Sequence, residues 1–224
     1  DGRVRFGSDH TLATGSQVTA RLVQFSGGTV NVNGTYDLNG IDTATTVTGG
    51  TTNFNANADV LDVGDTLSIS GGTATFSSGD ALSVTTYNLN GGTFSGSSDI
   101  TVSGVLTWTR GTMGGEGTTN ALGGMSLNGG QQTLTLNQGR LENPATATWT
   151  SGPIAIGQGA VLDNTGTFDV RTDHDISGTG TVENAGTFRK SAGTEETKIS
   201  STFTNTGTVD VQVGTVGLSG GGSG

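Results

Sequence analysis

The densest group of residues able to do acid–base chemistry lies between positions 169 and 175. Asp169, Arg171, Asp173, His174 and Asp175 bring carboxylates, a cation and an imidazole together. A glycosidase needs paired carboxylates at a set separation across a cleft, and a polysaccharide lyase needs a base beside cations that neutralise a uronate. Alternation along the chain turns Asp169 outward, and residues 172–175 are typical of a polar turn. We therefore interpret the group as a surface turn, with a catalytic site as the alternative.

Basic residues one repeat further along the chain add a little support to the catalytic alternative. A step of about one repeat can align Arg171 with Arg189 or Lys190. This gives a single pair of cations, whereas a lyase site needs a cluster. A polysaccharide-active lyase or hydrolase is therefore the second prediction, behind a non-catalytic protein.

Three aspartates at steps of three residues form the best candidate for a metal site. Asp59, Asp62 and Asp65 lie in the run Asp-Val-Leu-Asp-Val-Gly-Asp. The glycine-rich nonapeptide of calcium-binding β-rolls is not repeated there, and neither is the twelve-residue loop of helix-loop-helix calcium sites. We interpret the aspartates as a solvated acidic turn and expect no cofactor, with calcium as the alternative.

Trp108 and Trp149 are the residues best suited to stack on sugar rings. Each lies in a Thr-Trp-Thr sequence. On an alternating strand the tryptophan and its flanking threonines point to opposite faces. Burial of both indoles is therefore at least as well supported as their display to a polysaccharide.

The elements that hold these residues repeat at a fixed interval. Asn143, Asn164, Asn184 and Asn205 are 21, 20 and 21 residues apart, each with an apolar residue two positions before it and a threonine three positions after it. A period of this length is typical of stacked coils, which bury a continuous core only together.

A second repeat signal occupies the first half of the chain. Threonines follow a glycine pair or a close variant at steps of 22, 22, 20 and 19 residues, at Thr29, Thr51, Thr73, Thr93 and Thr112. The next step, from Thr112 to Thr146, fits neither one coil nor two. We therefore expect one elongated domain over residues 1–224, with about 10 coils of roughly 19–22 residues and an irregular coil or excursion near residues 113–137.

Within each repeat, side chains alternate with the two-residue period of β-strands. The 41 glycines exclude a helical protein, because each costs about 1 kcal/mol relative to alanine inside a helix. We predict an all-β fold, a parallel β-helix or β-solenoid. The usual preference of parallel crossover connections makes it right-handed.

Stacked coils place equivalent residues in columns. One predicted internal column contains Leu141, Leu162, Val182 and Phe203, and a second contains Ala147, Phe168, Phe188 and Val209. The four repeated asparagines point inward beside them, where each amide can donate to one neighbour and accept from the other. We interpret them as a ladder, with exposed asparagine turns as the alternative. Lys190 also falls at an internal position, so we expect its strand to end early or its side chain to lean outward.

Threonines of the same repeat are predicted to form an outward column with a spacing of about 4.8 Å. The column contains Thr146, Thr167, Thr187 and Thr208. A regular hydroxyl array can bind a crystalline or polymeric surface, ice included. Charged neighbours at 163, 169, 183 and 189 spoil a flat, weakly hydrated face. We interpret these threonines as ordinary strand residues, with surface binding as a less favoured alternative.

Composition excludes several partners. Nine basic and 19 acidic residues give a net charge of -10, whereas nucleic-acid binding depends on lysine and arginine contacts. The chain has no cysteine, so no thiolate metal site or cysteine nucleophile is available. No stretch approaches about 18 consecutive apolar residues, so we expect no membrane insertion by this segment. The chain stops after a predicted strand pair without a polar capping repeat, so we expect a segment of a larger protein.

Several runs carry a family resemblance. Asn164-Thr-Gly-Thr-Phe-Asp-Val, Asn184-Ala-Gly-Thr-Phe-Arg-Lys and Phe203-Thr-Asn-Thr-Gly-Thr-Val resemble the repeats of large secreted bacterial β-solenoid proteins of the adhesin and autotransporter-passenger types. The similarity covers most of residues 90–224. It implies a parallel β-helix that is secreted or displayed on the cell surface as a stalk, spacer or adhesive rod. Extracellular polysaccharide, a cell-surface ligand or end-to-end copies of the chain are the partners to expect.

Overall fold

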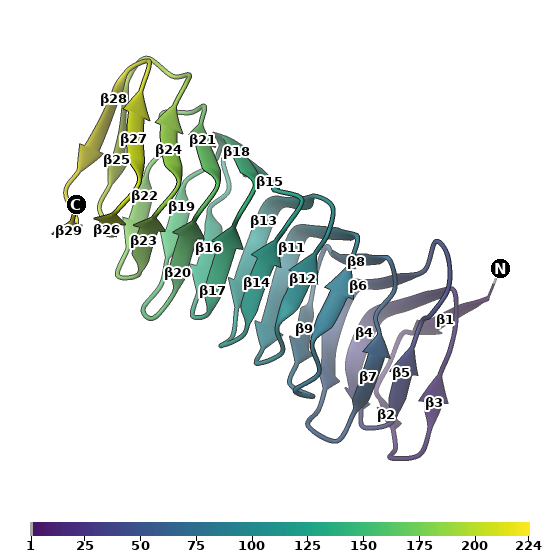
Figure 1. Ribbon diagram of the computed structural model, residues 1–224. Coiled ribbons are helices and arrows are strands. Elements are labelled where there is room, and N and C mark those ends of the chain that lie inside the picture. The colour runs from purple at the N-terminus through teal and green to yellow at the C-terminus, as the bar shows by residue number, and fades with distance from the viewer. Residues whose placement is uncertain (1) are drawn as a thin grey trace.

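The computed structural model describes residues 2–224 and contains strands and turns, with no helix in that range. Parallel strands stack into a β-solenoid of about 11 turns, and Figure 1 shows successive turns side by side from the N-terminal to the C-terminal end. The predicted all-β solenoid is confirmed, while its right-handed sense stays a prediction. No helix that could span a membrane occurs in residues 2–224.

Each turn contributes one strand to each of three faces of the solenoid. The first face consists of β1 (Arg3–Phe6), the N-terminal halves of β4 (Leu22–Val32), β6 (Ala44–Phe54), β11 (Thr86–Gly96) and β13 (Leu106–Gly114), and β8 (Thr66–Ile69), β15 (Met125–Asn128), β18 (Thr146–Ser151), β21 (Thr167–Val170), β24 (Thr187–Lys190) and β27 (Thr208–Val211). The second face consists of β2 (His10–Leu12), the C-terminal halves of the same four long strands, β9 (Thr73–Phe76), β16 (Leu134–Asn137), β19 (Ile154–Ile156), β22 (Ile176–Gly178), β25 (Glu196–Ile199) and β28 (Thr215–Leu218). The third face consists of β3 (Gln17–Val18), β5 (Thr35–Asp37), β7 (Asp59–Asp62), β10 (Leu82–Val84), β12 (Ile100–Val102), β14 (Thr118–Ala121), β17 (Arg140–Asn143), β20 (Val161–Asn164), β23 (Thr181–Asn184), β26 (Thr202–Asn205) and β29 (Gly222–Ser223).

Stacked glycines turn the chain from the first face to the second. Gly50, Gly72 and Gly92 have φ angles of 73°, 71° and 65°, a conformation that glycine adopts without steric cost. A Cβ on Gly72 would lie 2.4 Å from the carbonyl oxygen of Gly50, and one on Gly92 would lie 2.5 Å from that of Gly72. The repeated Gly-Gly-Thr sequence follows from this geometry, because the second glycine makes the corner and the threonine begins the next face.

The predicted internal columns line the core. Leu141, Leu162, Val182 and Phe203 are in-register partners on the third face, and Ala147, Phe168, Phe188 and Val209 are partners on the first face. The rings of Phe168 and Phe188 stack with centroids 5.5 Å apart and planes 5° apart. Val209 is 37% exposed because it lies in the last turn. Each fully buried side chain of this size contributes about 1.5–3 kcal/mol.

The four repeated asparagines form a hydrogen-bonded ladder inside the solenoid. The Nδ2 of Asn143 donates to Oδ1 of Asn164, that of Asn164 to Asn184 and that of Asn184 to Asn205, each over 2.7 Å. Each of the first three amides also donates to a backbone carbonyl of the next turn at 3.0 Å. The ladder begins at Asn143, whose Oδ1 is buried without a partner in the described chain.

The segment 113–137 stays within the stack as an irregular coil and makes no excursion from it. β14, β15 and β16 lie in it and pair with turns on both sides. Thr112 pairs with Thr135 on the second face, whereas Thr146 opens β18 on the first face. The step from Thr112 to Thr146 therefore compares two different faces. The irregularity is a β-bulge at Leu127 and Asn128, followed by a short loop before β16.

Lys190 is wholly buried, with an exposed fraction of 0%. It belongs to β24, and its Nζ donates to the carbonyl oxygen of Thr172 at 2.8 Å, to Oδ1 of Asp173 at 2.8 Å and to Oγ1 of Thr197 at 3.0 Å. The expectation of a short strand or an outward lysine is therefore wrong. Thr172 and Asp173 lie in the turn after β21, and Thr197 lies in β25. Together they supply three acceptors, which offset the cost of burying the ammonium.

Candidate functional site

The carboxylates of the predicted catalytic group do not converge on one point. The Nε of Arg189 donates to Oδ1 of Asp169 at 3.0 Å, Asp173 accepts from the buried lysine, and Oδ1 of Asp175 accepts from the backbone N–H of Lys198 at 2.9 Å. Each carboxylate therefore joins its own turn to the next one. Paired carboxylates across a cleft, which a glycosidase needs, are not formed by these residues.

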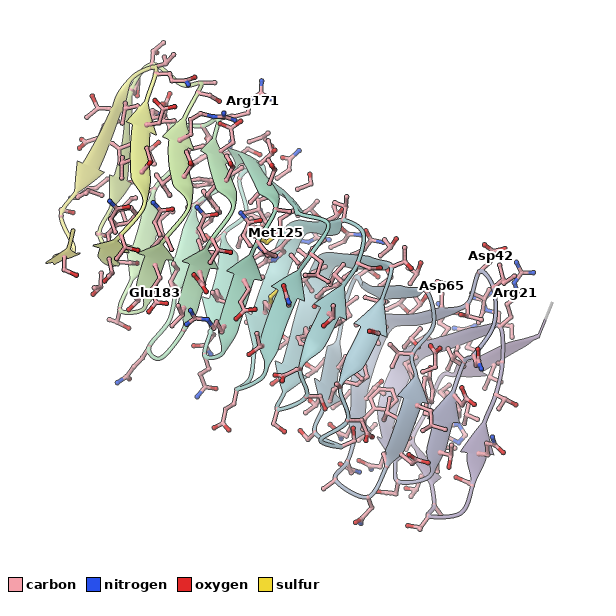
Figure 2. All side chains as sticks on the ribbon, viewed as in Figure 1. Arg21, Asp42, Asp65, Met125, Arg171 and Glu183 are labelled. Carbon is pink, nitrogen blue, oxygen red and sulfur yellow. The ribbon has the colours of Figure 1, made fainter. Side chains whose placement is uncertain are left out.

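The other two members of the group are also separate from it. Figure 2 shows Arg171 at the edge of the C-terminal turns, directed away from the coil. Its expected alignment is wrong, because Arg189 pairs with Asp169 and Lys190 pairs with Val170. The backbone N–H of His174 donates to Oγ1 of Thr172 at 3.3 Å, and within the described chain no hydrogen bond joins the imidazole to a carboxylate. No acid–base pair results.

The electrostatics of the carboxylates also favour ion pairing over acid catalysis. Burial raises the pKa of Asp169, but hydrogen bonds from Arg189 and Ser191 and the nearby arginine charges outweigh it, so the pKa lies below its ordinary value. The hydrogen bond from Lys190 lowers the pKa of Asp173. A general acid that works near neutral pH needs a raised carboxyl pKa, so both shifts have the wrong direction for that role.

Two of the three aspartates considered for calcium accept hydrogen bonds from backbone groups instead. Oδ1 of Asp62 accepts from the N–H of Gly64 at 2.5 Å, and Oδ2 of Asp65 accepts from the N–H of Thr43 at 3.2 Å. Asp59 opens β7 and is exposed. In residues 2–224 no group of three His, Cys, Asp or Glu side chains is arranged to hold a metal ion.

An ion-pair cluster that the sequence reading missed crosses three turns of the third face. The guanidinium of Arg140 lies 3.3 Å from Glu142, 2.6 Å from Asp163 and 2.8 Å from Glu183, the last of which Figure 2 labels on the C-terminal turns. The signal was an acidic residue directly before each of three repeated asparagines. Burial lowers the pKa of Arg140, but bonds to Asp163 and Glu183 outweigh it and raise the pKa. The cluster thus holds adjacent turns together.

Aromatic side chains are confined to the core. Trp108 is 1% exposed and Trp149 is 0% exposed, and Nε1 of Trp149 donates to the carbonyl oxygen of Gly152 at 2.8 Å. Every phenylalanine and tyrosine of the described chain is buried as well. The described surface therefore has no Trp, Tyr or Phe ring on which a sugar can stack.

Uncharged side chains form a regular array on the second face. In-register threonines make its main column, one in each of six successive turns: Thr29, Thr51, Thr73, Thr93, Thr112 and Thr135. Two residues further along the strands, a second column contains Asn31, Asn53, Thr75 and Ser95. We call these two columns the threonine face.

The strands hold the threonine face in a fixed geometry. Residues between the two columns, such as Val30, Ala74 and Phe94, point inward and are buried. Neighbouring residues within a column lie about 4.8 Å apart, and the two columns lie about 6.6 Å apart along the strand. Nδ2 of Asn53 donates to Oδ1 of Asn31 at 3.0 Å, which fixes both amides. In the described chain, no hydroxyl of the main column bonds to another protein group, so all are available to a ligand or to water.

None of the side chains in the two columns of the threonine face is charged, in a chain whose net charge is -10. Charged residues lie at the margins of this face: the carboxylate of Asp9 accepts from the N–H of Thr29 at 2.7 Å, and Arg110 lies two residues before Thr112. The column of Thr146, Thr167, Thr187 and Thr208 on the first face is in register too. Two residues further along those strands, however, Asp169 and Arg189 form an ion pair. The chain thus contains two threonine columns of the same spacing, one beside an uncharged second column and one beside the Asp169–Arg189 ion pair.

Comparison with family models, curated proteins and solved structures finds no match to this chain. Its resemblance to repeats of the adhesin and autotransporter-passenger types stays a prediction.

Proposed function

We propose that this chain is a non-catalytic structural or adhesive rod of a secreted or cell-surface protein, and that the threonine face is its adhesive surface. The observation that carries the proposal is the in-register, uncharged column from Thr29 to Thr135. A column of this kind presents the same group at equal intervals, which suits a ligand that is itself extended and periodic.

The rest of the molecule supports a rigid rod. The asparagine ladder, the Arg140 cluster and the buried Lys190 each join neighbouring turns. Threonine is stiff about χ1 because it is β-branched. A surface that is already ordered loses little conformational entropy on binding, and repeated weak contacts to one solid add as in multivalent binding.

The cellular location is part of the proposal. The acidic composition keeps an elongated, threonine-rich surface soluble, and the repeats resemble those of secreted bacterial proteins. A bacterial adhesin or passenger segment is the parent protein that fits both observations best.

The adhesive role is tested by sedimentation of the folded chain with uncharged crystalline solids, at low and at high salt. Because the face has no charge, we expect adsorption that does not weaken with salt, unlike binding between charged surfaces. Adsorption that disappears at high salt, or no adsorption to any solid, would contradict the proposal.

The non-catalytic character has its own test. The parent chain and His174→Ala are incubated with a panel of acidic and neutral polysaccharides, and new reducing ends or unsaturated products are measured. We expect no turnover by either protein. Turnover by the parent that His174→Ala abolishes would establish a polysaccharide-active enzyme, the alternative function.

A further inference from the structure

We infer that the ligand of the threonine face is ice. This inference rests on the proposed adhesive role and names the solid that the face recognises. It concerns the second face of the solenoid, and not the first-face column of Thr146, Thr167, Thr187 and Thr208, which lies beside charged residues.

Charge and ring chemistry narrow the choice of ligand. The side chains of the two columns are uncharged, on a chain of net charge -10, so they match a neutral surface and offer no charged group to a phosphate, a uronate or a basic peptide. Sugar polymers are commonly held by stacking on aromatic rings, and the phenylalanine, tyrosine and tryptophan side chains in residues 2–224 are buried. What remains is recognition by hydroxyl, amide and methyl groups at regular intervals.

Ordered water has the chemistry that such a face can match. A threonine hydroxyl has one donor and two acceptor positions. It can therefore both donate a hydrogen bond to a lattice water and accept one from it. The hydroxyls of the main column have no protein partner in the described chain. The face repeats at about 4.8 Å along the solenoid, which is close to the shorter oxygen repeat of hexagonal ice.

The construction of the face keeps its groups in position. Thr73 and Thr93 follow corner glycines, as do Thr29, Thr51 and Thr112, so the column starts at the same point on these five strands. The methyl group of each threonine reduces the number of competing hydrogen-bond arrangements for the water above it. The amides of Asn31 and Asn53 are held by their mutual bond, so the second column is also fixed at that end.

The chain contains a matched control for the test. Thr73 lies in the middle of the threonine face, between Thr51 and Thr93. Thr187 lies between Thr167 and Thr208 in the first-face column, and both residues are partly exposed. Thr73→Lys and Thr187→Lys therefore make the same chemical change in the same kind of column, on two different faces.

Ice affinity is measured as the fraction of protein taken into slowly growing ice and as freezing hysteresis, with serum albumin as the excluded standard. We expect the parent and Thr187→Lys to enter the ice, and Thr73→Lys to fall to the level of albumin. Thermal unfolding checks that both variants fold. If Thr73→Lys unfolds, Thr51→Lys replaces it, since Thr51 lies one turn away in the same column.

The remaining outcomes separate the inference from the proposed function. Exclusion of the parent from ice, together with adsorption to crystalline cellulose or chitin that Thr73→Lys removes, overturns ice as the ligand and leaves the adhesive role intact. Exclusion from ice and from both polymers overturns both. Uptake of Thr73→Lys into ice at the parental level shows that another surface binds, and overturns the assignment to this face.

Discussion

The Nζ of Lys190 lies 2.8 Å from Oδ1 of Asp173, and the two partners differ in exposure: the lysine side chain is 0% exposed and the aspartate side chain is 31% exposed. Removing Asp173 and removing Lys190 therefore have different consequences. Without Asp173, an ammonium remains inside the solenoid with only neutral acceptors. Without Lys190, the carboxylate can still be hydrated.

Asp173→Ala is expected to destabilise the fold by about 3 kcal/mol or more, because breaking a buried pair leaves an uncompensated charge. Lys190→Met, which replaces the ammonium by an apolar side chain of similar length, is expected to cost less. Urea unfolding at neutral pH measures both free energies. Asp42→Ala is the control, because the Arg21–Asp42 pair in Figure 2 is exposed and such pairs contribute about 1 kcal/mol or less. A larger loss in Lys190→Met than in Asp173→Ala would refute this reading.

Acid is expected to weaken the fold through Asp169 and Asp173. Their pKa values are lower in the folded chain than the ordinary value of 3.8, so the unfolded chain binds protons more readily. Their contribution is therefore complete above about pH 4–5 and is lost as the pH falls through the lowered values. Urea unfolding between neutral and strongly acidic pH should show stability falling below about pH 4. The free energy of unfolding of Asp173→Asn should fall less over the same pH range. An identical fall in the variant and the parent would contradict a contribution from Asp173.

Asn164→Ala is expected to destabilise the fold by about 1–3 kcal/mol for each buried partner left unsatisfied. Asn164 both accepts from Asn143 and donates to Asn184 at 2.7 Å. Asn53→Ala is the control, because it removes an amide–amide bond from the partly exposed threonine face and should change stability by about 0.5 kcal/mol. Thermal and urea unfolding compare the two. Equal losses of stability in the two variants would mean that burial of the asparagine ladder adds nothing to the stability of the fold.

Ala121→Asn is expected to stabilise the fold by about 1 kcal/mol, the contribution of a typical hydrogen bond. Asn120 pairs with Glu142, so Ala121 is the residue next to Asn143 in the preceding turn. Its new amide would donate to the Oδ1 of Asn143, which is buried and unpaired in the described chain. Ala121→Val, which has a similar volume and no amide, separates this effect from packing. A lower melting temperature for Ala121→Asn than for Ala121→Val would contradict the expectation.

The stack itself could be predicted from sequence because its internal positions repeat. Asn143 to Asn205 recur with apolar and threonine neighbours at constant offsets, and an in-register solenoid turns constant offsets into columns. The columns from Leu141 to Phe203 and from Ala147 to Val209 follow from the same rule. Local alternation and period thus contain enough information for the architecture.

Contacts between non-equivalent positions could not be predicted in this way. Lys190 occupies an inward site because Thr172, Asp173 and Thr197 provide acceptors, and nothing in the alternation of its own strand identifies them. The full main column of the threonine face could not be predicted from sequence. Thr135 does not follow a Gly-Gly pair, and Thr146 has the neighbours expected of the next member of the column although it lies on the first face. Only the register of β13 with β16 assigns Thr135 to that column.

Both the fold and the threonine face require Thr73 and Thr93 to be in-register neighbours on one face. Parallel neighbours lie about 4.8 Å apart, within the Cα separations of about 4.4–6.8 Å that a disulfide tolerates, and the chain has no cysteine of its own. Mass spectrometry after mild oxidation should find an intramolecular disulfide in a double variant, Thr73→Cys with Thr93→Cys, and free thiols in Thr73→Cys with Thr107→Cys, whose second site lies on the first face. Free thiols in the first pair, or equal cross-linking in both, would contradict the stacked arrangement and the binding face built on it.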